Sequence, residues 1–235
     1  AFGQEVGATG NDPLTFYLDK GLNENIIEAV RTNVGEAFPS NYPTSLPDFR
    51  PIPTQQDGVT LAVPLFSQTD PRWATNTIDE SNNNFFGAGC GPTSLAMVLK
   101  YFGKDVTPLQ IGKLQRSGIE YFFGVGSFLP GLAEMALNKY GVQYSPIPIS
   151  VSDIETHLLE GHPIIGSFGN FQFGSGWRSS GHISVIRGIG RCTIGTRTDT
   201  CLYFQDTFAQ GGEAAFFAST VINSFEIRAL YAFYK

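Results

Sequence analysis

Residues 89 to 102 place a single cysteine at the start of an apolar helix. The stretch reads Gly89-Cys90-Gly91-Pro92-Thr93-Ser94 and continues as Leu95-Ala96-Met97-Val98-Leu99-Lys100-Tyr101-Phe102. Pro92 suits a first helical turn because it has no N–H to leave unpaired, and the glycines let the backbone turn sharply beside the sulfur. The positive end of the helix dipole favours a thiolate. The pattern predicts either a reactive thiol or, as for most isolated cysteines, a small buried apolar residue.

The remainder of the chain predicts helices first and strands second. Further helices are predicted from Thr107-Pro108 to Arg116, from Leu129 to Tyr140 and, behind a Ser152/Glu155 capping box, to Glu160. Strands are predicted at 61–68, 163–168, 182–189, 201–205 and 227–234, with a short helical piece at 215–225. Because the two kinds of element do not alternate, we expect an α+β domain with a sheet that is antiparallel at least in part.

Residues 1–59 are predicted to form an N-terminal arm, and residues 60–235 the folded domain. Within the arm, apolar residues recur on one face of a possible helix from Asn23 to Ala37, and five prolines follow between residues 39 and 53. Packing, linking, or covering a cleft as a propeptide are all open roles for the arm. The polar loop from Ala74 to Ala88 is predicted to be exposed.

Composition bounds the class of protein and its partners. Of the 235 residues, 42% are hydrophobic and 15% are charged, so a disordered chain is excluded. The net charge of -6 and the absence of Lys/Arg clusters argue against nucleic acid or an anionic membrane as the main partner. No apolar run is long enough to span a membrane. The sequence predicts no cofactor and no metal site, and it does not indicate an oligomeric state.

The three cysteines divide into a pair and a single residue. Cys192 and Cys201 bracket a turn-rich segment between two predicted strands, so a disulfide that clamps this hairpin is expected. A disulfide implies an oxidising compartment, and the chain starts at Ala1, which suits either a processed secreted protein or a trimmed chain. We therefore expect a secreted or extracytoplasmic location, with Cys90 as the free thiol.

A nucleophilic thiol needs a general base, and the sequence offers three histidines. His157 lies within a predicted helix and reads as a surface or boundary residue, and His162 follows a glycine at a helix-to-strand turn, where it reads as a polar cap. His182 opens a strand after Gly181, and Asp206 ends the next strand. Two neighbouring strands can therefore present an imidazole and a carboxylate side by side.

Several motifs together resemble the papain-like cysteine peptidases of the bacteriocin-processing, double-glycine leader type. The resemblance is greater to the free-standing relatives of these peptidases, which have no transporter. The resemblance covers about residues 60 to 235 and is strongest around Cys90. The motifs that carry it are Val63-Pro64-Leu65-Phe66-Ser67-Gln68 with Asp70 and Trp73, Gly89 to Leu99, Gly161-His162-Pro163-Ile164-Ile165, Gly181-His182, and Tyr203-Phe204-Gln205-Asp206.

The resemblance implies a helical half packed against an antiparallel sheet, with the site in the cleft between them. It also implies Cys90 as nucleophile, His182 as general base and acid, Asp206 as the orienting group and Gln68 as an oxyanion donor. The family usually has Asp-Pro where this chain has Asp206-Thr207. A polar strand-end residue remains the alternative for Gln68, and a turn-capping carboxylate remains the alternative for Asp206.

The sequence is compatible with three different functions. The first is a cysteine peptidase that hydrolyses peptide bonds through a thioester acyl-enzyme. The second is an acyl or peptidyl transferase of the same fold, similar to phytochelatin synthases, in which an amine or thiol replaces water. The third is a catalytically idle domain that binds peptides or glycans. A peptide or protein is the expected substrate of the first, and its sequence specificity is not indicated.

Overall fold

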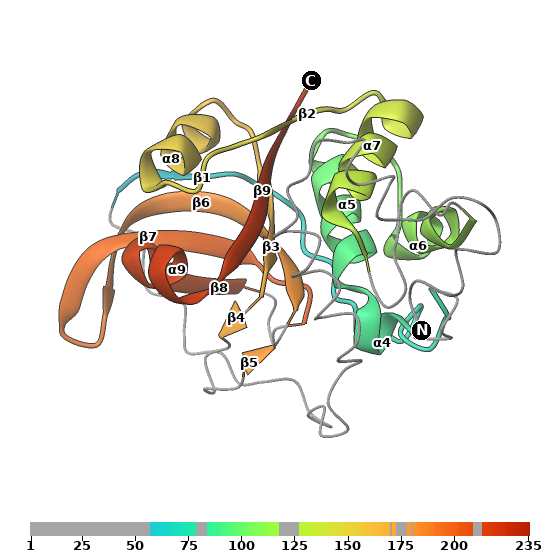
Figure 1. Ribbon diagram of the computed structural model, residues 1–235, viewed down its shortest axis with the longest axis horizontal. Helices are drawn as coiled ribbons and strands as arrows, with labels where there is room; N and C mark the ends of the chain where they lie inside the picture. The colour runs from blue at the N-terminus through green and yellow to red at the C-terminus, as the bar shows by residue number, and fades with distance from the viewer. Residues whose placement is uncertain are drawn as a thin grey trace.

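The computed structural model describes residues 57–78, 84–117, 127–169, 171–172, 178–179, 181–208 and 213–235. The predicted N-terminal arm, including its helix at 23–37, lies almost entirely outside the described residues. Within them, the helices between residues 85 and 140 occupy one side of the molecule, and an antiparallel sheet with two further helices beside it occupies the other, which confirms the α+β class (Figure 1). No helix in this described part has the length and apolar character needed to cross a membrane.

Helix α5 (Cys90–Tyr101) is the centre of the helical half. It packs against α6 (Pro108–Ser117), α7 (Leu129–Tyr140) and the longest strand of the sheet, so every residue from Gly91 to Leu99 is buried. A helix enclosed on all sides must be apolar all round, which explains the unbroken run in its sequence. The short helix α4 (Phe85–Ala88) leads directly into it (Figure 1).

The main sheet has the strand order β2-β9-β3-β6-β7-β8, with β1 beside β6, and each pairing is antiparallel. Strands β6 and β7 form a long hairpin through a turn at Gly195, whose φ is +65°. A separate two-stranded ribbon pairs β4 (Phe171–Gln172) with β5 (Arg178–Ser179). The main strands are β1 (Val59–Thr60), β2 (Gln143–Pro146), β3 (Ile164–Phe168), β6 (His182–Ile194), β7 (Arg197–Gln205), β8 (Glu213–Phe217) and β9 (Ile227–Tyr234).

The four helices predicted between residues 90 and 160 are present, and one of them has a different N-cap from the predicted one. Helix α8 (Val151–Leu159) is capped by Ser150, whose Oγ accepts a hydrogen bond from the Asp153 N–H at 3.1 Å. The predicted cap, Ser152, lies inside the helix. Ser150 takes the role because its backbone is extended, as an N-cap requires. Helix α7 ends as predicted at Gly141, whose φ of +65° suits glycine.

Two other predicted elements are wrong. Residues 61–68 do not form the predicted strand. Ladder pairing is confined to Val59 and Thr60, just before it, and after the Leu61 N–H has donated to the Arg187 carbonyl oxygen, Pro64 has no N–H with which to continue a ladder. The predicted helical piece 215–225 is divided into the end of β8 and helix α9 (Ala218–Ser224). The first part is a strand because it pairs with β7 from Cys201 to Gln205.

The segment 74–88 is predicted to be exposed, but its described ends are exposed only in part. Ile78, Phe85 and Ala88 have no exposed surface, and they form a small core with Trp73. The asparagines in the middle of the segment suggested a solvated loop, but the apolar residues on either side of them determine its packing. This small core supports α4, and α4 supports the start of α5.

Candidate active site

Cys90 is the first residue of α5 and a free, half-buried thiol. Both neighbouring glycines are needed for close packing. A Cβ atom on Gly89 would lie 2.5 Å from the Phe85 carbonyl oxygen, and one on Gly91 would lie 2.1 Å from Ser127 Oγ. The φ of Gly89 is -81°, so a backbone conformation restricted to glycine is not the reason for its presence. Because neither glycine has a side chain, Phe85 and Ser127 can pack directly against the start of α5. This packing holds in place the helix turn that carries the sulfur.

A buried hydrogen bond connects the cysteine helix to the histidine strand. Ser94 lies one helical turn after Cys90, and its Oγ donates to the carbonyl oxygen of Ile183 at 3.1 Å. Ile183 directly follows His182 on β6. The first turn of α5 is therefore joined to the start of β6, where the imidazole is attached.

His182 and Asp206 form a buried ion pair. His182 Nε2 lies 2.7 Å from Asp206 Oδ2, and the two residues are 6% and 0% exposed. The antiparallel register pairs Val185 with Gln205, so the beginning of β6 lies beside the end of β7. The predicted proximity of imidazole and carboxylate is thus present in the structure.

Two more donors hold the carboxylate. Ser184 Oγ donates to Asp206 Oδ2 at 2.8 Å, and the Phe208 N–H donates to Oδ1 at 2.9 Å. With His182, each carboxylate oxygen has at least one donor, as a buried charge requires. Asp206 is therefore fixed in position and can orient the imidazole ring.

Burial and charge act in opposite directions on this pair. Burial alone lowers the pKa of His182, but the negative charge of Asp206 and the hydrogen bonds with Asp206 and Cys90 outweigh it and raise the pKa well above 6.5. Burial alone raises the pKa of Asp206, but the charge of His182 and the hydrogen bonds it accepts hold the pKa below 3.8. Because Asp206 engages Nε2, Nδ1 is the ring nitrogen left for the Cys90 thiol.

Gln68 lies between the segment that precedes Cys90 and the segment that follows Asp206. Its Nε2 donates to the Phe86 carbonyl oxygen at 2.8 Å, and its Oε1 accepts from Thr207 Oγ1 at 2.7 Å. Its backbone N–H also donates to the Thr207 carbonyl oxygen at 2.8 Å. The side chain is 1% exposed, and one of the two Nε2 hydrogens is used by Phe86. The amide is held rigidly, with a second donor hydrogen left.

Two hydroxyl groups that support this arrangement, those of Ser94 and Ser184, are not among the site residues predicted from the sequence. Ser94 appeared only as part of the cysteine motif, and Ser184 only as part of a strand. Both are fully buried in otherwise apolar stretches. A polar residue within such a run is the signal that could have identified them, because a buried hydroxyl needs a partner.

The described residues that could hold a metal ion together lie elsewhere. His157, Glu160 and His162 form the one such group in the described part of the chain. His162 precedes β3, whose far end, at Phe168, is paired with His182. The two groups of residues therefore lie at opposite ends of one strand.

Comparisons with known proteins agree with this architecture. Residues 60–228 match the sequence model of the Peptidase_C39-like family. The fold is similar to the crystal structure of xylellain, a cysteine protease from Xylella fastidiosa, with a TM-score of 0.51 and 10% sequence identity over 80% of this chain and 91% of xylellain. No curated protein sequence matches the chain.

The family match spans well over half of the chain, and it covers the cysteine helix, the imidazole strand and the carboxylate loop. At 10% identity the likeness to xylellain carries the fold, and that fold has the predicted order of a helical half followed by an antiparallel sheet. The chain belongs to the Peptidase_C39-like family and is a cysteine peptidase of papain-like fold.

Proposed function

We propose that this peptidase hydrolyses peptide bonds through a Cys90-His182-Asp206 triad and a thioester acyl-enzyme. The supporting observation is the buried His182–Asp206 ion pair, in which His182 also hydrogen-bonds to Cys90. The raised pKa of His182 keeps the imidazole protonated at neutral pH, so a proton is available there for the departing amine. Asp206 holds the ring in the orientation that directs Nδ1 toward the sulfur.

Each step of the cycle then has a group in place. The Cys90 thiolate attacks the carbonyl carbon of the scissile bond, and His182 gives its proton to the departing amine. A water molecule loses a proton to His182 as it attacks the thioester; the C–S bond then breaks, which releases the acid product and restores the thiolate and the protonated imidazole. Because His182 accepts and donates in turn, one residue serves as general base and general acid.

Two donors are proposed for the negative oxygen of the tetrahedral intermediates. Cys90 is the first residue of α5, so its backbone N–H is one of those with no carbonyl partner inside the helix. The second donor is the remaining Nε2 hydrogen of Gln68, whose amide is fixed by Phe86 and Thr207. A donor of this kind contributes about 3 kcal/mol to transition-state stabilisation in comparable sites.

We also propose that the enzyme works in an oxidising, extracytoplasmic compartment on peptide or protein substrates. Support comes from the disulfide between Cys192 and Cys201, whose residues are fully buried between β6 and β7. Structural disulfides persist mainly in secreted and periplasmic proteins. Thiol titration of protein isolated from its native source without reductant would test this: one free thiol is expected, and three would contradict it.

The triad is tested with a peptide library and two variants. Wild type is expected to cleave library members, whereas folded Cys90→Ala and His182→Ala proteins should show no cleavage above background. Mass spectrometry after iodoacetamide treatment should find the label on Cys90 and a parallel loss of activity. Products formed with an added amine distinguish hydrolysis from transfer, since transfer leaves an amide adduct. Equal cleavage by wild type and Cys90→Ala would refute the proposal.

A further inference from the structure

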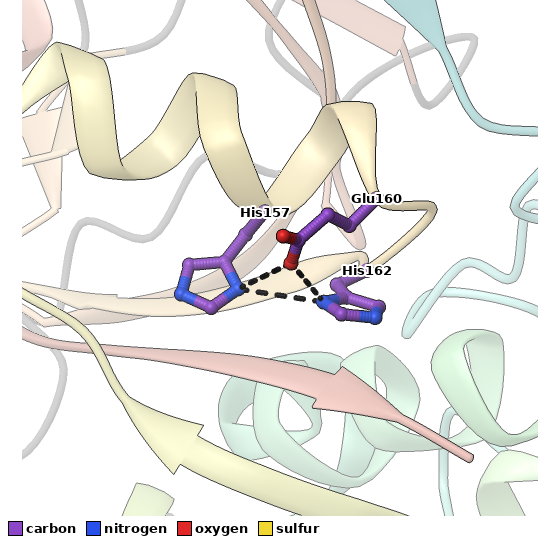
Figure 2. A group of neighbouring side chains, drawn as sticks. All are labelled: His157, Glu160 and His162. Atoms are coloured by element: carbon purple, nitrogen blue, oxygen red, sulfur yellow. Dashed lines mark hydrogen bonds and ion pairs between the residues drawn. The ribbon is translucent and has the colours of Figure 1, made fainter.

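Two histidines and a glutamate meet at the end of α8, away from the proposed triad. His157 lies in the last turn of the helix, Glu160 is its C-cap, and His162 begins the segment that enters β3. Figure 2 shows the three side chains directed toward one another. Their side chains are 24%, 55% and 25% exposed, so an ion can reach them from solvent.

The distances among the three nearest atoms suit a transition-metal ion. His157 Nδ1 lies 3.4 Å from His162 Nδ1, and Glu160 Oε2 lies 3.9 Å and 3.3 Å from the two nitrogens (Figure 2). A point equidistant from three such atoms lies about 2.1 Å from each, which is the usual length of Zn–N and Zn–O bonds. In a tetrahedral zinc site with such bonds, ligand atoms lie about 3.4 Å apart. Two of the three separations already fit.

The backbone holds the two imidazoles in this arrangement. Gly161 has a φ of +83°, which turns the chain back so that the His162 N–H donates to the His157 carbonyl oxygen at 2.9 Å. Tyr101 supports the turn, since its hydroxyl donates to the Gly161 carbonyl oxygen at 3.2 Å. The His162 ring also packs against Tyr234, with ring centres 5.2 Å apart. The ligand atoms are therefore arranged before an ion binds, which lowers the ordering cost of binding.

The chemistry of the donors selects the class of ion. Two imidazoles and one carboxylate suit zinc and neighbouring transition metals, whereas magnesium and calcium prefer oxygen ligands alone. Imidazole binds a metal ion through a ring nitrogen, and Nδ1 of each ring faces the Glu160 carboxylate. Glu160 supplies a negative charge beside the two rings.

We propose that His157, Glu160 and His162 bind one Zn²⁺ ion, with water completing the tetrahedron. Such an ion bridges the end of α8 and the entry to β3, and so fixes the helix against the sheet. The site lies beyond the N-terminal end of β3, whereas His182 is paired with the C-terminal end of that strand at Phe168. The ion is thus expected to stabilise the fold without taking part in peptide hydrolysis.

Calorimetric titration of Zn²⁺ into the metal-free Cys90→Ala protein tests the proposal, because this background removes the thiol as a competing ligand. We expect one ion per chain at micromolar or lower concentration. His157→Gln, His162→Gln and Glu160→Gln, each in the same background, should weaken binding by roughly tenfold or more. Glu155→Gln is the matched control: it removes the same charge from an exposed position of α8 and should leave the affinity unchanged.

Two further measurements separate loss of ligands from loss of folding. Co²⁺ in place of Zn²⁺ should give the intense visible absorption of a four-coordinate site, and this absorption should disappear in the half-exposed Glu160→Gln variant, whose fold is expected to be intact by circular dichroism. Zn²⁺ at 100 times its dissociation constant should raise the Tm by roughly 5–10 °C. No binding below millimolar Zn²⁺, or binding by all three ligand variants as tight as by the Cys90→Ala parent, would overturn the proposal.

Discussion

The hydroxyl of Ser94 donates a hydrogen bond of 3.1 Å to the carbonyl oxygen of Ile183, in the interior of the protein. Ser94 belongs to the helix that starts with Cys90, and Ile183 follows His182 on β6. The two residues therefore join the helical half to the sheet within one turn of the thiol. Because the sulfur and the imidazole come from different halves, this contact is placed to determine how they face each other.

Ser94→Ala is expected to lower kcat/KM by roughly tenfold through kcat, with KM little changed, because the thiol and imidazole lose their alignment. Loss of the buried hydrogen bond should also reduce the free energy of unfolding by about 1–3 kcal/mol. Steady-state kinetics and urea unfolding measure the two effects. Thr93→Val is the control, since Thr93 Oγ1 is buried without a hydrogen-bond partner among the described residues; an equal loss of kcat in both variants would contradict a positioning role.

Asp206→Asn is expected to lower kcat/KM by roughly 10²–10⁴, as loss of the orienting carboxylate does in related triads. It should also move the alkaline limb of the pH profile to lower pH. The sign follows from the ion pair: the charge of Asp206 raises the pKa of His182, so its removal lets the imidazolium lose its proton sooner. The profile of kcat/KM against pH is the measurement.

The control for that variant is Asp105→Asn, which removes a negative charge from a residue whose carboxylate is 99% exposed and pairs only with Lys100 in the described contacts. We expect its profile to match wild type. An alkaline limb in Asp206→Asn at the same pH as in wild type would show that the carboxylate does not control the imidazole.

The same ion pair predicts a window of pH in which it stabilises the fold. The raised pKa of His182 contributes stability that is complete below pH 6.5 and is lost at higher pH, and the lowered pKa of Asp206 contributes stability that is lost below pH 3.8. The difference in unfolding free energy between wild type and Asp206→Asn should therefore be largest between these values. Urea unfolding at several pH values measures this difference. A difference that does not change with pH would show that the His182–Asp206 ion pair does not stabilise the fold.

Some elements of the fold could be predicted from short stretches of sequence alone. The helix at Cys90, the stop at Gly141 and the strand that begins at His182 each have a start, an end or an apolar run that can be recognised in isolation. The nearness of His182 to Asp206 followed from their positions at the ends of neighbouring strands. A contact between two strands depends on which strands are neighbours in the sheet. Consecutive strands in the chain are often neighbours, and β6 and β7 are consecutive.

Features that depend on a distant partner could not be predicted. Strand β8 reads as a helix because its pairing with β7 is not visible in its own residues. Ser184 has no role until β7 brings Asp206 beside it. His157 and His162 were interpreted singly, because only the left-handed turn at Gly161 brings their rings together.

Gln68→Ala is expected to lower kcat by roughly 10²–10³ with a small change in KM, because an oxyanion donor acts mainly in the transition state. Thr207→Val provides a graded comparison: it keeps the amide and removes the hydroxyl that fixes its oxygen, so a smaller loss of kcat is expected. Burst and steady-state kinetics on an activated ester substrate measure both. A rise in KM alone would assign Gln68 to substrate binding instead.

The disulfide between Cys192 and Cys201 should stabilise the β6–β7 hairpin without affecting catalysis. It closes a short loop, with a sequence separation of 9, for which loop-closure entropy predicts about 2–3 kcal/mol. The double variant Cys192→Ala/Cys201→Ala should therefore unfold at a Tm lower by roughly 5–10 °C, with kcat/KM near wild type at 25 °C. Reduction of wild type with dithiothreitol should give the same shift and leave the double variant unchanged. A large loss of kcat/KM in the folded double variant would show that the hairpin contributes to the active site.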